Sequence, residues 1–203
     1  MIELYAITDD PTPPDPPLRA VESNGLTALC APTGRREVTP DALWRHEEVV
    51  EALMESRDLL PVRFGTIVSD ERAAARAVEQ RKEELAASLE RVRGAVELAV
   101  RAQRHESEGD APPESESGRK YMIAKARRLA AARPVHEPLA ALARDSALQR
   151  GPELLHAAYL VDRDAVERFV SLVRRLQQGH PELDILCTGP WPPYSFAEAG
   201  GRS

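Results

Sequence analysis

A chain of 203 residues can fold as two small domains, and a hydrophobic content of 42% is enough to give each of them a buried core. The formal net charge of −6 argues against general affinity for nucleic acid. No apolar run reaches the roughly 18 residues of a membrane span and no basic signal region opens the chain, so we expect a cytoplasmic protein that does not contact membrane.

Three strands are predicted in the first half of the chain. Residues 2–8 alternate between apolar and polar side chains well enough for a strand. Residues 26–30 follow the turn signal Asn24-Gly25 as a second strand, and residues 59–68 predict a third. Short strands separated by a turn and by helical stretches are typical of an α+β domain.

Two helices are predicted on either side of the third strand. Thr39 suits the N-cap and Pro40 the first position of a helix that buries one apolar face. The residues expected on that face are Leu43, Val50, Leu53 and Met54. Ser69 or Asp70 is expected to cap a second, long helix that continues to about Arg93.

The second half of the chain, after Gly94, predicts a second α+β domain. The expected elements are strands at 95–102, 154–161 and 183–187, helices at 120–133 and 139–147 separated by Pro134, and a helix at 164–178. A short edge strand between Ala147 and Leu154 would complete the split βαβ, ferredoxin-like arrangement. We therefore expect two domains, at 1–93 and 94–203.

The stretch 105–118 differs from the rest of the second half. It contains five acidic residues, three serines and two prolines, and no aliphatic side chain larger than alanine. Such a stretch cannot bury enough apolar surface to offset the entropy lost on ordering. We expect a disordered, acidic loop.

An aromatic and proline-rich string, Gly189-Pro190-Trp191-Pro192-Pro193-Tyr194-Ser195-Phe196, follows the last predicted strand. Its prolines exclude a helix and favour a stiff, extended segment. Two interpretations stay open, a strap that closes a core and a ledge that docks a partner. Trp191, Tyr194 and Phe196 are the candidate contacts of such a ledge. We expect Trp191 to be the structural anchor and Tyr194 the more exposed contact.

Arg63 is the odd residue in the third strand, because its neighbours Val62 and Phe64 are apolar. One interpretation is an ion pair with Glu47 or Glu48 from the preceding helix. The other is a contact with a partner. Arg63 is therefore the fourth candidate partner-binding residue.

No constellation of residues points to catalysis or to a cofactor. His46-Glu47 begins like the helix motif of zinc proteases, but a valine stands where the second histidine is needed, so we expect both side chains to pack or pair locally. Cys30 and Cys187 are far apart and are expected as buried free thiols. Ser195 lacks the flanking glycines of a nucleophile elbow. We expect no metal, no cofactor and no enzymatic activity.

Several strings resemble the blocks of one protein family and occur in the family's order. They are Trp44-Arg45-His46-Glu47-Glu48-Val49-Val50 with Leu60-Pro61-Val62-Arg63-Phe64-Gly65-Thr66-Ile67, then Gly118-Arg119-Lys120-Tyr121-Met122, Ala158-Tyr159-Leu160-Val161, and the C-terminal string already described. Together they span nearly the whole chain. They are similar to the gas vesicle accessory proteins GvpL and GvpF.

The resemblance implies two α+β domains, the second a modified ferredoxin-like fold. It also implies a non-enzymatic accessory protein of the cytoplasm and the gas vesicle. Such a protein would contact the small, hydrophobic major shell protein and other accessory proteins during vesicle formation, holding an aggregation-prone partner or capping its assembly. The alternative is a small-molecule enzyme or regulatory domain on a ferredoxin-like scaffold, which a pocket with converging polar groups would favour.

Overall fold

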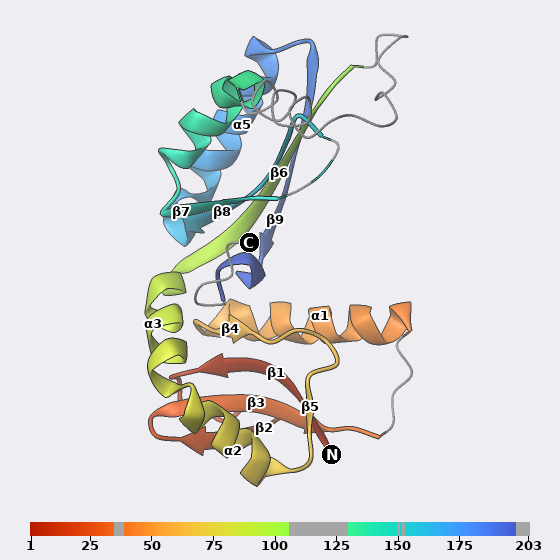
Figure 1. Ribbon diagram of the computed structural model, residues 1–203, viewed down its shortest axis with the longest axis vertical. Coiled ribbons are helices and arrows are strands. Elements are labelled where there is room, and N and C mark those ends of the chain that lie inside the picture. Colours follow the sequence, from red (N-terminus) through yellow and green to blue (C-terminus); the bar gives the residue numbers. More distant parts are fainter. Residues whose placement is uncertain (35–38, 106–129, 150, 152, 198–203) are drawn as a thin grey trace, which may run out of the picture. The chain divides into compact units, whose positions relative to one another are not determined.

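The computed structural model describes residues 1–34, 39–105, 130–149, 151 and 153–197. The chain divides into two compact units, and each combines a β-sheet with helices (Figure 1). The first unit holds Met1–Val96 and the segment that begins at Trp191, and the second holds Glu97–Pro190. We expected residues 94–203 to lie in one domain, whereas the chain from Trp191 onward groups with the first unit.

Five strands form the sheet of the first unit. β1 (Ile2–Thr8) pairs on one side with β3 (Leu26–Pro32), which in turn pairs with β2 (Arg19–Ser23). On its other side, β1 pairs with both β4 (Leu60–Pro61) and β5 (Ile67–Val68). All these pairings are antiparallel. The first two predicted strands are confirmed, and β2 was not predicted.

A two-residue turn joins β2 to β3. Asn24 has a φ of 52° and Gly25 a φ of 83°, and Ser23 pairs with Leu26 across the turn. Positive φ at both central residues defines a type I′ hairpin turn, whose twist matches that of the strands and which favours Asn-Gly. The turn read from the sequence is confirmed.

α1 (Pro40–Ser56) begins where it was predicted, because the Thr39 hydroxyl accepts a hydrogen bond from Ala42 N at 3.2 Å. Its buried residues are Ala42, His46, Val50, Leu53 and Met54. The expectation that Leu43 lies on this face is wrong, because its side chain is 43% exposed. His46 lies four residues from both Ala42 and Val50, so the buried stripe passes through these three positions instead.

The third predicted strand is broken in the structure. Within residues 59–68, β4 and β5 both pair with β1, and the residues between these two short strands are not part of the sheet. A turn with Gly65 at a φ of 80° separates the two short strands. Glycine is favoured there because a Cβ atom disfavours positive φ.

The second predicted helix is also broken. It consists of α2 (Glu71–Gln80) and α3 (Lys82–Val92), which meet at Arg81. Asp70 caps α2 as expected, accepting a hydrogen bond from Ala73 N at 2.8 Å. α2 contacts β2 and β3, whereas α3 contacts β4, so the break lets the two helices pack on different strands.

The second unit has a four-stranded sheet with two helical segments packed against it. In spatial order, its strands are β7 (Asp145–Leu148), β8 (Leu155–Asp162), β6 (Ala95–Arg104) and β9 (Leu183–Trp191). Residues 130–140 are helical, and α5 (Val166–Gly179) follows a short 3₁₀ turn at Arg163–Ala165. Both helical segments supply residues to one core with the strands (Figure 1).

Tyr159 lies at the centre of that core and is fully buried. Its ring centroid is 5.3 Å from that of Phe169, and its hydroxyl oxygen is 2.8 Å from His136 Nδ1. Burial raises the pKa of Tyr159 and lowers the pKa of His136. Both shifts favour the neutral form, so this hydrogen bond joins two uncharged groups.

The strands predicted in the second half and the helix at 164–178 are confirmed within a few residues. Pro134 does not interrupt its helix, because Val135 and Leu139 are fully buried and hold residues 130–140 against the sheet. The helix expected at 139–147 is wrong. Its second part is β7, which pairs antiparallel with β8.

Two further expectations concern residues outside the described part of the chain. The acidic loop predicted at 105–118 falls there from residue 106 onward, and so does the predicted helix before residue 130. Among the described residues, no helix is both long and apolar enough to cross a membrane.

Candidate partner-binding site

A buried carboxyl–imidazole pair lies between β1 and α1. Glu3 is 1% exposed and His46 is 0% exposed. His46 Nδ1 is 3.2 Å from Glu3 Oε1, and His46 Nε2 donates a hydrogen bond to Val62 O at 2.8 Å. The imidazole also stacks on Tyr5 and meets Phe64 edge-on. With both nitrogens engaged, the ring fixes β1, α1 and the chain after β4 relative to one another.

This pair corrects the expectation that His46 pairs locally. Its partner Glu3 lies 43 residues away in sequence, on a different element. Glu47, its neighbour on α1, has a separate role, because its carboxylate accepts a hydrogen bond from the Tyr194 hydroxyl at 3.2 Å. Two adjacent residues of one helix therefore bind two distant parts of the first unit.

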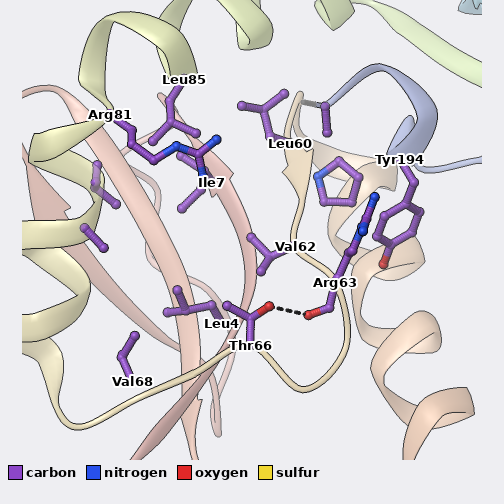
Figure 2. Close-up of a pocket in the computed structure, with 14 residues that line it drawn as sticks. Leu4, Ile7, Leu60, Val62, Arg63, Thr66, Val68, Arg81, Leu85 and Tyr194 are labelled. Carbon is purple, nitrogen blue, oxygen red and sulfur yellow. Dashed lines mark hydrogen bonds between the residues drawn. The ribbon is translucent and has the colours of Figure 1, made fainter. Parts of the chain in front are cut away.

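We call Val62–Thr66 the rim loop. Both of its ends are hydrogen-bonded to the backbone of β1, at 2.8 Å through Val62 N and at 2.9 Å through Thr66 O. Within the loop, the Thr66 hydroxyl donates to Arg63 O at 2.7 Å (Figure 2). The N–H of the turn glycine points at the Glu3 carboxylate, 3.5 Å away. The buried pair and β1 thus set the backbone that presents Arg63.

We call Pro192–Ala197 the C-terminal segment. It contains a short 3₁₀ turn at Tyr194–Phe196, which corrects the expectation that its prolines exclude any helical turn. Phe196 is only 3% exposed, and the Arg91 guanidinium donates a hydrogen bond to its carbonyl oxygen. With the bond from Tyr194 to α1, the segment is attached to both α3 and α1.

Tyr194 is half-buried, and burial together with the nearby Glu47 carboxylate raises the pKa of its hydroxyl. The neutral hydroxyl is thus favoured in the folded state. Tyrosine in the unfolded chain ionises near pH 10. The contribution of the Tyr194 hydroxyl to the free energy of unfolding should therefore be complete below about pH 10 and should decrease as the pH rises further.

Replacing Tyr194 with phenylalanine should cost about 1 kcal/mol at neutral pH, through loss of the hydrogen bond to Glu47. The difference from wild type should shrink above about pH 10, because the variant cannot ionise at this position. Urea denaturation at pH 7 and at pH 10.5 measures both values. An unchanged difference at the higher pH would contradict the assigned role of the hydroxyl.

A cavity of about 270 Å³ lies between the sheet of the first unit and the α2–α3 helices (Figure 2). Its apolar walls include Leu4, Ile7, Leu60, Val68, Val78 and Leu85. The rim loop supplies Val62, Arg63 and Thr66, and the C-terminal segment supplies Tyr194 and Ala197. We call this the sheet–helix cavity. It lies wholly within the first unit, between the sheet and the helices of that unit.

Two guanidinium groups belong to the lining of this cavity. Arg63 approaches from the side of Tyr194, and Arg81 from the junction of α2 and α3 (Figure 2). Arg81 binds both carboxylate oxygens of Glu84, at 2.7 Å and 3.0 Å. Both side chains of that pair are partly exposed, so solvent screens the ion pair.

The four candidate partner-binding residues differ in their positions and in their burial. Arg63 and Tyr194 line the same cavity although they are far apart in sequence. Phe196 is buried in the same C-terminal segment. Trp191 is 40% exposed at the end of β9, so the expectation that it is the buried anchor is wrong. Phe196 takes that place, because the 3₁₀ turn directs it inward.

Three residues of the site were not identified from the sequence. Glu3 is the one charged residue of β1, whose seven residues are all buried, and this charge among uncharged neighbours was the available signal. His46 was noted in a failed zinc motif and in a string that resembles the family, and it was expected to pack or pair locally, but its pairing with Glu3 was not foreseen. Arg81 stands in a helical stretch rich in charged side chains, where nothing local distinguishes it from its neighbours.

The described residues contain no group of three or more histidine, cysteine, aspartate or glutamate side chains that could hold a metal ion. Burial raises the pKa of both cysteine thiols, Cys30 and Cys187, which keeps them protonated and poorly nucleophilic. What the described site offers is therefore an apolar hollow with cationic groups at its edge.

Comparison with known proteins places this geometry in context. The family model "Gas vesicle synthesis protein GvpL/GvpF" matches residues 4–198. Gas vesicle protein L of Streptomyces sp. (strain CB03234) is 33% identical, over 77% of this chain and 69% of the relative. Gas vesicle protein F of the same organism is 31% identical, over 91% of this chain and 90% of the relative.

Two crystal structures share the fold. Gas vesicle protein GvpF from Microcystis aeruginosa superposes with a TM-score of 0.80 at 18% identity, over 98% of this chain and 99% of that one. GvpF from Anabaena sp. PCC7120 superposes with a TM-score of 0.80 at 21% identity, over 98% and 96% of the two chains. At these identities, the likeness establishes the α+β fold.

Proposed function

This chain belongs to the GvpL/GvpF family of gas vesicle synthesis proteins, and we propose that it acts without catalysis, as an accessory protein in vesicle formation. In this proposal it contacts the hydrophobic major shell protein and other accessory proteins, in the cytoplasm and at the gas vesicle. It holds or caps its partner through shape and charge, and no covalent step is involved.

One observation carries the proposal. Three of the stretches that resemble the family, 44–50, 60–67 and the C-terminal string from Trp191 onward, lie far apart in sequence but all belong to the first unit. His46 binds the rim loop, and Glu47 binds Tyr194 of the C-terminal segment. The rim loop and the C-terminal segment both line the sheet–helix cavity. Such convergence on an apolar hollow with cationic edges supports a docking role.

We further propose that the second unit is a modified ferredoxin-like domain. Its elements follow the order β6, helix, β7, β8, α5 and β9, with spatial strand order β7-β8-β6-β9. This order supports the split βαβ arrangement. The fold hosts many functions, so the second unit by itself favours neither an enzyme nor a binding protein.

Co-precipitation tests the proposed contact. The full chain, tagged at its N-terminus, is expected to retain the major shell protein when both are produced together. A tagged, unrelated α+β protein of similar charge serves as the control for adhesion of a hydrophobic protein. Retention no greater than by this control would contradict the proposal.

A further inference from the structure

We propose that the sheet–helix cavity binds a short segment of a partner protein that carries a bulky aliphatic side chain next to a carboxylate. The inference rests on the proposed function in one respect, that the occupant is a protein. Its chemistry is inferred from the cavity itself.

The size of the cavity limits its occupant. Its volume of about 270 Å³ equals that of roughly nine water molecules. Pockets for drug-sized ligands measure roughly 300–1,000 Å³. The cavity therefore has room for one or two aliphatic side chains of a peptide and lies just below the range for drug-sized ligands.

The walls select apolar groups. Leu4 and Ile7 come from β1, and Val78 and Leu85 from the facing helices. The Thr66 hydroxyl on the rim is already bonded within the loop, and the Tyr194 hydroxyl is bonded to Glu47. An aliphatic side chain gains from leaving water here, whereas a polar ligand would find few free groups to replace its hydration.

Charge complementarity selects a carboxylate beside that apolar group. Arg63 and Arg81 lie at different sides of the cavity (Figure 2). A guanidinium binds a carboxylate through two parallel hydrogen bonds. The Arg81–Glu84 pair is partly exposed to solvent, so an incoming carboxylate can compete with Glu84 for the guanidinium. The rim loop, bonded to β1 and to His46, presents Arg63 already in place.

The probe for this proposal is a fluorescent hexapeptide with two leucines between two glutamates, titrated against the full chain. A peptide with lysines in place of the glutamates should bind at least about fivefold more weakly, because it opposes the two arginines. Arg63→Gln should reduce that preference to about twofold or less. Equal binding of the two peptides to wild type would overturn the proposal.

A variant that fills the cavity provides a second test of the proposal. Ala77 lines it from α2, so Ala77→Leu should weaken binding of the glutamate peptide at least about tenfold while leaving the melting temperature unchanged or higher. Ala75→Leu, on the same helix but not in the cavity lining, is the matched control and should bind within about twofold of wild type. Unchanged binding by Ala77→Leu would overturn the proposal.

The two proposals fail separately. If the glutamate peptide does not bind but the major shell protein still co-precipitates, only the cavity assignment is overturned. If the peptide binds as described and the shell protein does not co-precipitate, the proposed function fails and the cavity remains a peptide site. Binding of decanoate, measured by calorimetry, without any binding of the peptide would reassign the cavity to a fatty acid and overturn the inference.

Discussion

Replacing His46 with leucine should destabilise the protein by about 3–5 kcal/mol, the range for removing one member of a buried polar pair. Three losses contribute. The Glu3 carboxyl group loses the imidazole that faces it inside the protein, Val62 O loses its donor, and the stacking on Tyr5 disappears. Urea denaturation at pH 7 measures the change. A loss below about 1 kcal/mol would contradict the assigned role of the pair.

Two controls isolate this effect. His105 is exposed and pairs with Asp184 on the surface, so His105→Leu should change stability by less than about 0.5 kcal/mol. The double variant Glu3→Leu/His46→Leu should lose less than the sum of its two single variants, by at least about 1 kcal/mol. Additive losses would mean that the two side chains do not act as a pair.

Replacing Phe196 with alanine should cost about 3–5 kcal/mol, because its ring is almost wholly buried and its removal leaves a cavity. Trp191→Ala should cost about 1 kcal/mol or less, because that ring is 40% exposed. Thermal and urea denaturation of both variants measures the difference. A larger loss for Trp191→Ala than for Phe196→Ala would reverse the assignment of the buried anchor.

Features set by adjacent residues could be predicted from the sequence. The Asn24-Gly25 turn, the Thr39 cap and the Asp70 cap all depend on interactions within four positions of the chain. The periodic helix over 164–178 and most strands are also local patterns. Each of these is found in the structure close to its expected place.

Features set by distant contacts could not be predicted in the same way. The third strand breaks where Val62 binds His46 and the turn glycine faces Glu3, and these partners lie up to 62 residues apart. The long helix breaks at Arg81 because its halves pack on different strands. No breaker residue marks that position in the sequence.

In the candidate site, too, some features were predicted from the local sequence, whereas others depend on distant contacts. Arg63 was selected because it is unusual for its strand, and Tyr194 was selected as one of three aromatic residues in the C-terminal string; both line the cavity. Which aromatic of the C-terminal string is buried depends on the direction of the 3₁₀ turn, which is set by contacts with α1 and α3. The exchange of roles between Trp191 and Phe196 follows from that turn.

Assembly of gas vesicles in a host that carries a defined set of vesicle genes tests the central claim most directly. Intact vesicles are measured as the part of the light scattering that is lost when applied pressure collapses them. With this chain as the sole GvpL/GvpF protein, wild type and the exposed-helix control Arg72→Glu should restore the signal. Arg63→Glu should lower it at least about tenfold when the variant and wild type are compared at equal levels of folded protein. Vesicle formation by Arg63→Glu at the wild-type level would contradict the claim that the rim of the sheet–helix cavity binds a partner in assembly.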